Sequence, residues 1–334
     1  MSNIQVLDCT LRDGGYVNEW AFGDENAQEI ARLISQTGVD YFEVGFIKLC
    51  DYVKDIIQFN QMDQVAKLFK PTKQKLSMIV EVGYGYPVTS FPERSDNTVD
   101  LVRVIMWKRM LKEGLQYCKE LKKRGYEVGV QATRTEQYSL KEFAELIEMF
   151  NEVNPKAIYI VDTFGLLTKD HLFEYAHIAD EHLGNGIRLG YHAHNNMQQA
   201  FSNTRAMCEE NWKHDIMLDA SVLGMGRGAG NLCLELLMKY LNETRGCHYS
   251  IDQLYEVADK YLMKFYQESP WGYSMPYFLS AKNGRNPSYV HYMEHKGLTI
   301  QQISTVFSLM RERGVGITYD TRMCDEIINE VIAG

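Results

Sequence analysis

Ile4-Gln5-Val6-Leu7-Asp8-Cys9-Thr10-Leu11-Arg12-Asp13-Gly14-Gly15 is the segment on which the choice between two α/β architectures depends. Residues 4–9 are mostly apolar and include β-branched side chains, which predicts a buried strand. The turn that follows is not the G-x-G-x-x-G turn that opens a doubly wound, dinucleotide-binding sheet. The first unit of the chain therefore favours a different α/β fold.

Alternating β-rich and amphipathic helical runs continue from this segment. Strands are expected at residues 4–9, 41–46, 76–82, 101–107, 127–131, 157–162, 187–191 and 216–222. Helical runs follow most of them, near residues 25–37, 62–69, 140–151, 169–182, 197–211 and 232–244, with another that ends at residue 124. Eight such units in about 245 residues predict a (β/α)8 TIM barrel, whose usual length is about 250.

The rest of the chain has no clear alternation of strands and helices. Helices are expected near residues 251–267, 288–294, 300–313 and 324–332, around an aromatic and polar stretch at 270–287. We therefore predict a TIM-barrel catalytic domain at residues 1–245 and a helical C-terminal extension at 246–334, packed on the barrel.

Composition narrows the function classes. The 334 residues are 45% hydrophobic and 24% charged, and 35 basic against 44 acidic residues give a net charge of −9. This charge disfavours nucleic-acid binding through a general basic surface. There is no apolar run of about 18 residues and no signal-like N-terminus, and the seven cysteines form no CxxC pair. We expect a cytoplasmic protein that does not bind membranes.

The sharpest candidate site is His192-Ala193-His194 at the end of the seventh predicted strand. Residues two apart on a strand point to the same face, so both imidazoles can reach one ion. Asp13, across the mouth of the barrel, would complete a two-histidine, one-carboxylate metal site. The alternative is one structural and one solvated histidine, and the position at a strand end favours the metal. Asn231 is either a helix cap or a fourth ligand.

Further charged residues lie at other predicted strand ends. Arg12 and Arg134 are candidates for holding a carboxylate or an oxyanion, and structural salt bridges are the alternative. Glu43 and Asp162 stand on apolar strands, where each is expected to pair with an arginine or to support a metal ligand. The run Gly224-Met225-Gly226-Arg227-Gly228-Ala229-Gly230 is either an anion cradle or a tight turn.

Together these motifs resemble the HMG-CoA lyase-like superfamily of TIM-barrel metallolyases. Asp8-Cys9-Thr10-Leu11-Arg12-Asp13-Gly14 and His192-Ala193-His194-Asn195 are similar to its two strongest motifs. The family includes hydroxymethylglutaryl-CoA lyase, 4-hydroxy-2-oxovalerate aldolase and the isopropylmalate, homocitrate and citramalate synthases. In layout the chain is most similar to the aldolase.

The resemblance implies a divalent ion, Mn²⁺ or Mg²⁺ with Zn²⁺ or Co²⁺ as alternatives, held by Asp13, His192 and His194, with Asn231 joining in some members. It implies that Arg12 stabilises an enolate oxygen and that Thr163 contacts the substrate. Tyr273 is a weak match to a site tyrosine of the aldolases. Candidate substrate contacts are therefore Arg12, Asp13, Glu43, Arg134, Thr163, His192 and Tyr273.

Two departures from the family pattern matter. Tyr16 stands where the aldolases have a catalytic histidine, and its unperturbed pKa near 10 is far from neutrality, so it needs tuning to act as a base. The loop at residues 224–231 contains no cysteine, which disfavours a CoA-thioester lyase.

Chemistry and resemblance agree on a metal-dependent aldolase that acts on a 4-hydroxy-2-oxo acid through a pyruvate enolate. The first alternative is an acyl-CoA-condensing synthase, and the second is a non-catalytic, metal-binding barrel. The expected partners are a small 2-oxo acid and further copies of the chain in a homo-oligomer. The resemblance adds an aldehyde dehydrogenase as a candidate partner.

Overall fold

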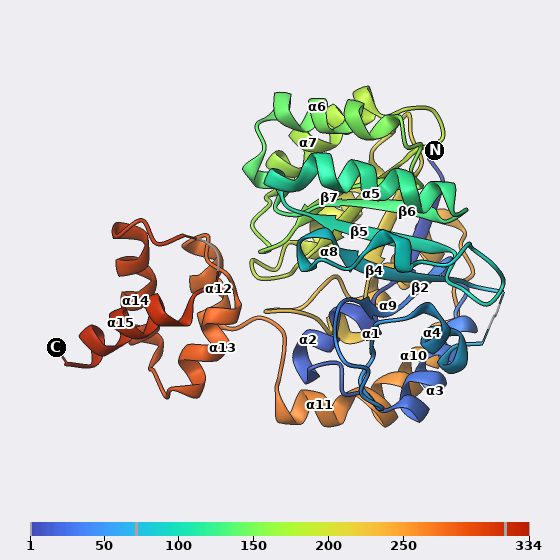
Figure 1. Ribbon diagram of the computed structural model, residues 1–334. Helices are drawn as coiled ribbons and strands as arrows, with labels where there is room; N and C mark the ends of the chain where they lie inside the picture. Colours follow the sequence, from blue (N-terminus) through green and yellow to red (C-terminus); the bar gives the residue numbers. More distant parts are fainter. Residues whose placement is uncertain (1, 71–72, 317–318, 334) are drawn as a thin grey trace.

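The computed structural model describes residues 2–70, 73–316 and 319–333. Its centre is a closed barrel of eight parallel strands surrounded by helices (Figure 1). The strands are β1 (Ile4–Asp8), β2 (Tyr41–Ile47), β4 (Lys75–Glu81), β5 (Leu101–Met106), β6 (Glu127–Ala132), β7 (Ala157–Asp162), β8 (Arg188–Ala193) and β9 (Ile216–Ala220). All eight predicted strands and the TIM-barrel prediction are confirmed.

The barrel closes because its first strand, β1, pairs with both the second strand, β2, and the last strand, β9. Ile4 of β1 lies opposite Ile216 of β9, and Leu7 lies opposite Tyr41 of β2. A two-residue strand, β3 (Gln58–Phe59), adds to the end of β2 and was not predicted. The carboxyl ends of the eight strands therefore converge at one mouth.

Most helices follow the predicted pattern. They are α3 (Asp24–Ser35), α4 (Met62–Leu68), α5 (Leu111–Lys123), α6 (Leu140–Asn151), α7 (Lys169–His182), α8 (Ala200–Glu209) and α9 (Leu234–Arg245). After β1 the chain makes two short helices that were not predicted, α1 (Thr10–Asp13) and α2 (Gly15–Asn18). These two helices place the residues that follow β1 over the mouth of the barrel.

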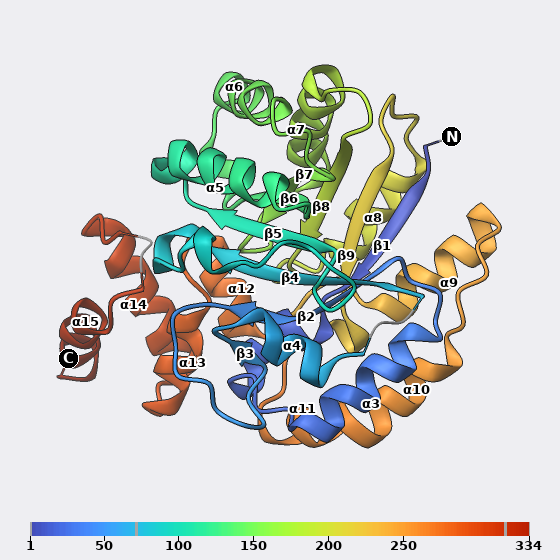
Figure 2. The ribbon, with the colours of Figure 1, turned by 45° about the vertical axis from the view of Figure 1, so that its right-hand side comes forward.

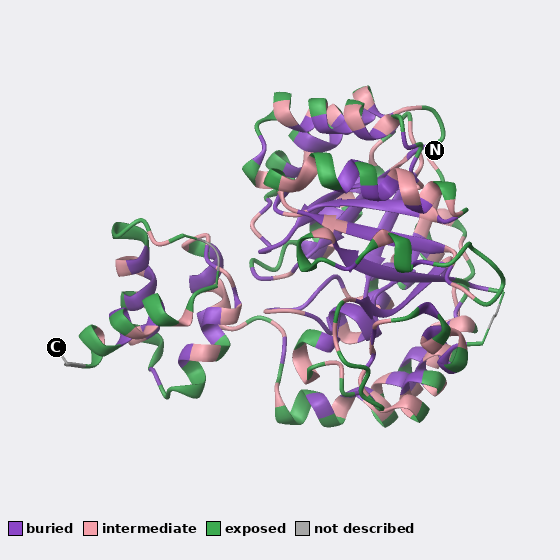
Figure 3. Cartoon of the chain, viewed as in Figure 1, coloured by how far each residue is buried: buried purple, intermediate pink, exposed green. Residues whose placement is uncertain are grey.

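Alternation along the strands separates the outer core from the barrel interior. On β5, Val102 and Val104 belong to the large core beneath the helices, whereas Leu101 belongs to a smaller cluster with residues of β1, β2, β7 and β9. Arg103 shares the inward face with Leu101 and is fully buried. The strands are buried along nearly their whole length (Figure 3), so a charge in this interior requires partners.

The C-terminal extension has two parts. Its first part, α10 (Asp252–Val257), a π-helical turn (Ala258–Leu262) and α11 (Met263–Glu268), packs on the barrel, where Phe265 contacts Phe22 with ring centres 5.5 Å apart. The second part forms a separate lobe with its own core (Figures 1 and 2). Its helices are α12 (Met275–Lys282), α13 (Ser288–His295), α14 (Ile300–Glu312) and α15 (Thr321–Ala333).

Of these helices, α12 was not predicted and falls in the aromatic stretch at 270–287. The domain boundary after residue 245 stays a prediction, and residues 1, 71–72, 317–318 and 334 of the predicted ranges lie outside the described residues. Within the described ranges, no helix is both long enough and apolar enough to cross a membrane.

Candidate metal centre at the barrel mouth

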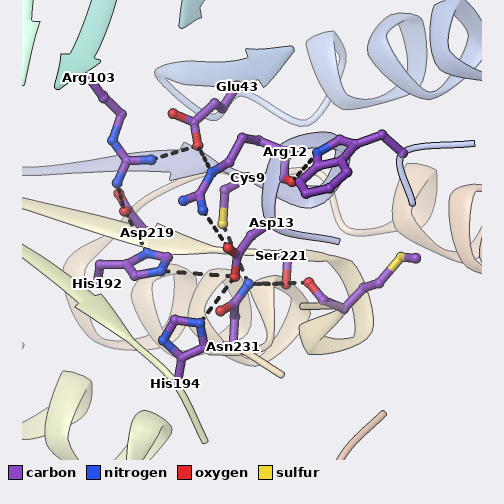
Figure 4. Close-up of polar contacts among 12 residues, drawn as sticks. Cys9, Arg12, Asp13, Glu43, Arg103, His192, His194, Asp219, Ser221 and Asn231 are labelled. Carbon is purple, nitrogen blue, oxygen red and sulfur yellow. Dashed lines mark hydrogen bonds and ion pairs between the residues drawn. The ribbon is translucent and has the colours of Figure 1, made fainter. Parts of the chain in front are cut away.

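Three buried side chains from distant parts of the sequence meet at the mouth (Figure 4). Asp13 ends α1, His192 lies in β8, and His194 follows that strand. Asp13 Oδ2 is 3.4 Å from His194 Nε2 and 4.0 Å from His192 Nε2. One ligand atom from each residue lies within 4.8 Å of the others, so the predicted trio is brought together.

Hydrogen bonds behind the two imidazoles set their orientation. His192 Nδ1 lies 2.9 Å from Asp219 Oδ2, and His194 Nδ1 lies 3.0 Å from the main-chain oxygen of Asp162. When Nδ1 carries the proton, Nε2 of each ring presents a lone pair toward Asp13. Burial lowers the pKa of His192, which favours the neutral, ligating form.

Buried polar atoms without hydrogen-bond partners show that this arrangement fits a cation. Asp13 Oδ2, His194 Nε2 and Asn231 Oδ1 are buried and have no hydrogen-bond partner among the described residues. Leaving such atoms unpaired is costly, and a divalent ion would satisfy all three. Gly226 covers the cluster closely, because a Cβ at this position would lie 2.9 Å from Asp13 Oδ2.

Asn231 is placed as a candidate ligand and not as a helix cap. It forms a β-bridge with His194, and its Nδ2 donates to the main-chain oxygen of Met225 at 3.2 Å. The residue at the N-cap of α9 is Cys233, so the helix-cap interpretation of Asn231 is wrong.

Buried ion pairs connect the candidate ligands with Arg12. Arg12 forms an ion pair with Asp13, and Arg12 Nε donates to Glu43 Oε2 at 2.6 Å. The same Glu43 oxygen accepts from Arg103 at 2.7 Å, and Arg103 forms a further ion pair with Asp219. Because Asp219 contacts His192, the chain of contacts returns to the candidate metal centre (Figure 4).

The net charge of this network also favours a cation. Three buried carboxylates face two buried guanidinium groups, an excess of one negative charge when both histidines are neutral (Asp13, Glu43, Asp219, Arg12 and Arg103). Burial opposes ionisation of Asp13, but the charge of Arg12 holds its pKa well below the usual value. The carboxylate is therefore ionised at neutral pH.

Sequence reasoning missed two members of this network. Arg103 and Asp219 are almost fully buried on otherwise apolar strands, β5 and β9. The argument that identified Glu43, a charge on an apolar strand that requires a partner, would have found both. For Glu43 the predicted arginine pairing is confirmed.

Asp162 differs from that expectation. Its carboxylate accepts from the main-chain N–H groups of Leu166 at 2.7 Å and Leu167 at 3.1 Å, and it forms no ion pair with an arginine in the described residues. Of the two alternatives predicted for Asp162, an arginine partner or support of a metal ligand, the arginine partner is therefore excluded. The main-chain oxygen of Asp162 nevertheless orients His194, as described above.

Arg134 and Thr163 lie together at the ends of β6 and β7. The Arg134 N–H donates to Thr163 Oγ1 at 2.8 Å, and Arg134 Nε donates to Glu136 Oε1 at 2.8 Å. The Arg134 guanidinium also lies 4.6 Å from the centre of the Phe164 ring. A structural salt bridge thus occupies Arg134 in this structure, and a substrate contact at either residue stays a prediction.

Tyr16 lies on α2 beside the centre. Its ring packs edge-on against Trp20, with ring centres 4.7 Å apart, and the Arg227 guanidinium lies 5.5 Å from the ring centre. The residue is nevertheless partly open to solvent, with 41% of its surface exposed. Loss of water around the hydroxyl raises the pKa of Tyr16 to about 12 despite the attraction of Arg227, so the hydroxyl keeps its proton at neutral pH.

Tyr273 and the glycine run complete the predicted site residues. Tyr273 is 49% exposed between α11 and α12 and makes no hydrogen bond to any described residue, so its role stays a prediction. In the glycine run, the Gly230 N–H donates to the Arg227 carbonyl at 3.1 Å. The tight-turn interpretation is confirmed, and an anion cradle formed by the loop stays a prediction.

The fold and site define a TIM barrel with a candidate metal centre at the carboxyl ends of its strands. A sequence model of the HMGL-like family matches residues 3–260, well over half of the chain. The chain belongs to this family, and the resemblance drawn from its motifs is confirmed.

Curated relatives are consistent with this membership. The chain is 25% identical over 262 residues to a protein of Bacillus cereus named 4-hydroxy-2-oxovalerate aldolase, an alignment that covers 77% of this chain and 74% of the relative. It is 21% identical over 323 residues to an oxaloacetate decarboxylase of Mycobacterium tuberculosis, covering 95% and 89% of the two chains.

Solved structures share the fold. The N-terminal domain of a putative aldolase from Bacteroides vulgatus superimposes with a TM-score of 0.71 at 23% identity, covering 89% of this chain and 98% of that domain. An HMG-CoA lyase from Brucella melitensis gives a TM-score of 0.60 at 14% identity, covering 80% and 99%. These matches support the barrel architecture.

Proposed function

We propose that the protein is a divalent-metal-dependent carbon–carbon lyase that cleaves a 4-hydroxy-2-oxo acid into pyruvate and an aldehyde. The observation that carries this proposal is the buried trio of Asp13, His192 and His194 with the Arg12 guanidinium beside it. The relatives named 4-hydroxy-2-oxovalerate aldolase support the substrate class. Mn²⁺ and Mg²⁺ are the proposed ions.

Arg12 is the residue suited to stabilise the developing enolate. A bound divalent ion would supply Lewis-acid polarisation of the 2-oxo group. Glu43 and Asp13 hold Nε and one terminal nitrogen of Arg12, while Nη2 makes no hydrogen bond to any described residue. A fixed guanidinium with a free N–H group can donate to an enolate oxygen without reorganisation.

Tyr16 is suited to donate a proton and not to remove one. With a pKa raised to about 12, its hydroxyl is protonated throughout the neutral range. We propose that it donates a proton to the carbon of the pyruvate enolate, which becomes the methyl group of pyruvate, after the 4-hydroxyl has lost its proton and the carbon–carbon bond has broken. This replaces the role of base that the family position of Tyr16 suggests.

The proposal is tested by exchange of the methyl protons of pyruvate. We expect the Mn²⁺-loaded protein to replace these protons with deuterium from D₂O, and NMR follows the loss of the methyl signal. Exchange reports on the enolate alone, because each enolate that forms loses a methyl proton and regains one from the solvent. Arg12→Ala is expected to slow exchange by about 10²–10³-fold, the usual effect of removing one donor to a developing oxyanion. The absence of exchange in the wild-type protein, with Mn²⁺ shown to be bound, would contradict the lyase proposal and favour a non-catalytic barrel.

Tyr16→Phe is expected to lower kcat for cleavage of 4-hydroxy-2-oxopentanoate by about 10²-fold or more, because a positioned proton donor contributes about 10²–10⁴-fold. Mn²⁺ affinity should not change. Tyr255→Phe is the matched control: Tyr255 is an exposed tyrosine on α10, away from the barrel mouth, and the variant should keep full turnover. Unchanged turnover in Tyr16→Phe would remove this hydroxyl from the mechanism.

Oxaloacetate decarboxylation is a second candidate that uses the same enolate. It is favoured by the relative of that name, whose alignment extends over 95% of this chain. Loss of oxaloacetate with release of CO₂, at a rate above that of 4-hydroxy-2-oxopentanoate cleavage, would select it. The synthase alternative is tested by adding acetyl-CoA and following free thiol. Assembly into a homo-oligomer and binding of an aldehyde dehydrogenase stay predictions.

A further inference from the structure

Arg227 lies beside the candidate metal centre but takes no part in the network around it. It stands between Gly226 and Gly228 in the loop after β9. Gly226, the residue before Arg227, closely approaches Asp13 Oδ2, so the main chain of this loop passes next to the candidate ligands. The guanidinium continues over the ring of Tyr16. It therefore flanks the position that a substrate of this centre would occupy.

The C-terminal lobe holds the Arg227 side chain in this position. Arg227 Nη2 donates to Asn286 Oδ1 at 2.6 Å, just before α13, and to Ser288 Oγ at 3.1 Å, the first residue of α13. These acceptors are neutral, so they fix the guanidinium without offsetting its charge. Arg227 Nε is buried and has no hydrogen-bond partner among the described residues.

Arg227 has no ion-pair partner among the described residues, unlike the arginines near it. Within the described residues no carboxylate oxygen lies within 4.0 Å of Arg227, whereas Arg12, Arg103 and Arg134 each form an ion pair. Glu81 is the nearby acid and its charge acts on Arg227 from a distance, but the two form no ion pair, and Glu81 Oε1 accepts instead from Trp107 Nε1 at 2.8 Å. A partly buried cation without a counter-charge is costly unless an anion binds there.

We infer that Arg227 recognises an anionic group, a carboxylate or a phosphate, at the end of the substrate remote from its 2-oxo acid. The inference rests on the proposed function, which places the 2-oxo acid at Asp13. A guanidinium suits either anion because its planar N–H groups can donate two parallel hydrogen bonds. The substrate class is thereby narrowed to 2-oxo acids with a second negative charge.

A purely structural role, in which Arg227 only ties the lobe to the barrel, makes a different prediction. In that role Arg227 would act only through its hydrogen bonds to neutral side chains of the lobe. Its loss would then change the stability of the protein without changing its preference between ligands. The two roles are therefore separated by measuring preference between ligands and not affinity alone.

Isothermal titration of the Mn²⁺-loaded protein supplies the test. The probes are 2-oxopentanoate, 2-oxoglutarate and 2-oxo-4-phosphonobutanoate, which share the 2-oxo acid and differ in the remote group. We expect at least one anionic probe to bind at least tenfold more tightly than 2-oxopentanoate, and the stronger of the two identifies carboxylate or phosphate as the natural group. In Arg227→Gln this ratio should fall to about one, with partial recovery in Arg227→Lys.

Arg322→Gln is the matched control, because Arg322 is exposed on α15, and it should keep the wild-type ratio. Equal affinities in the wild-type protein, no binding of either anionic probe, or an unchanged ratio in Arg227→Gln would each overturn the inference. Pyruvate exchange in the same samples tests the proposed function separately. If the protein prefers an anionic probe but does not exchange pyruvate protons, the lyase proposal is rejected and the role of Arg227 is kept. If it exchanges pyruvate protons but shows no preference, the lyase proposal is kept and the role of Arg227 is rejected.

Discussion

Asp13→Asn is expected to weaken Mn²⁺ binding by more than about 100-fold and to abolish pyruvate exchange at micromolar metal. Removing a residue that only supports a metal ligand costs about 10–100-fold in affinity, and a direct ligand should cost more. Asp13 is the one carboxylate in the trio, and its Oδ2 faces both histidines. An amide at this position loses the charge that attracts the ion and that holds Arg12.

Titration calorimetry with Mn²⁺ measures this effect directly. Asp8→Asn is the matched control, since Asp8 is equally buried at the end of β1 but accepts hydrogen bonds from Thr10 at 2.7 and 3.1 Å. Asp8→Asn should bind Mn²⁺ as the wild-type protein does. If D13N protein bound Mn²⁺ with wild-type affinity, the ion would have to lie elsewhere, and the proposed centre would be rejected.

Sequence reasoning located this centre because the relevant constraints are local. Residues 192 and 194 share a strand face by the two-residue period of a strand, and the strand end fixes their place at the mouth. Asp13 follows β1 in the same way, and closure of the barrel through β1 places it two strands away from β8, with β9 between them. Periodicity and topology were therefore sufficient to bring the three candidate ligands together.

Pairings between strands were beyond such reasoning. The sequence shows that Glu43 requires a cation, but not whether Arg12, Arg103 or both supply it. Arg227 is similar, because its anchors Asn286 and Ser288 belong to a lobe whose first helix, α12, was not predicted. Helix α12 lacks a clear amphipathic period because its sequence, MPYFLSAK, is apolar around most of the helix.

Arg103→Met is expected to lower the free energy of unfolding by about 3–5 kcal/mol, the usual cost of breaking a buried ion pair by removing one partner. Arg103 is fully buried and contacts two carboxylates, Glu43 and Asp219. Among the described residues, Arg12 is the only other arginine or lysine within 4.0 Å of either carboxylate, and it contacts Glu43. Methionine fills similar space but leaves both charges less compensated. Urea unfolding of the metal-free protein measures the change. Arg205→Met is the control, because its ion pair with Glu209 is exposed and should contribute less than about 1 kcal/mol.

A second substitution distinguishes lost charge compensation from lost packing. If unpaired negative charge causes the instability of Arg103→Met, adding Asp219→Asn should recover part of the loss, because the buried interior then holds one carboxylate fewer. If the cause is lost packing against Tyr159, whose ring centre lies 4.9 Å from the guanidinium carbon, the double variant should be less stable than either single one. Recovery would show that Arg103 stabilises the barrel by balancing the carboxylates that orient His192 and Arg12.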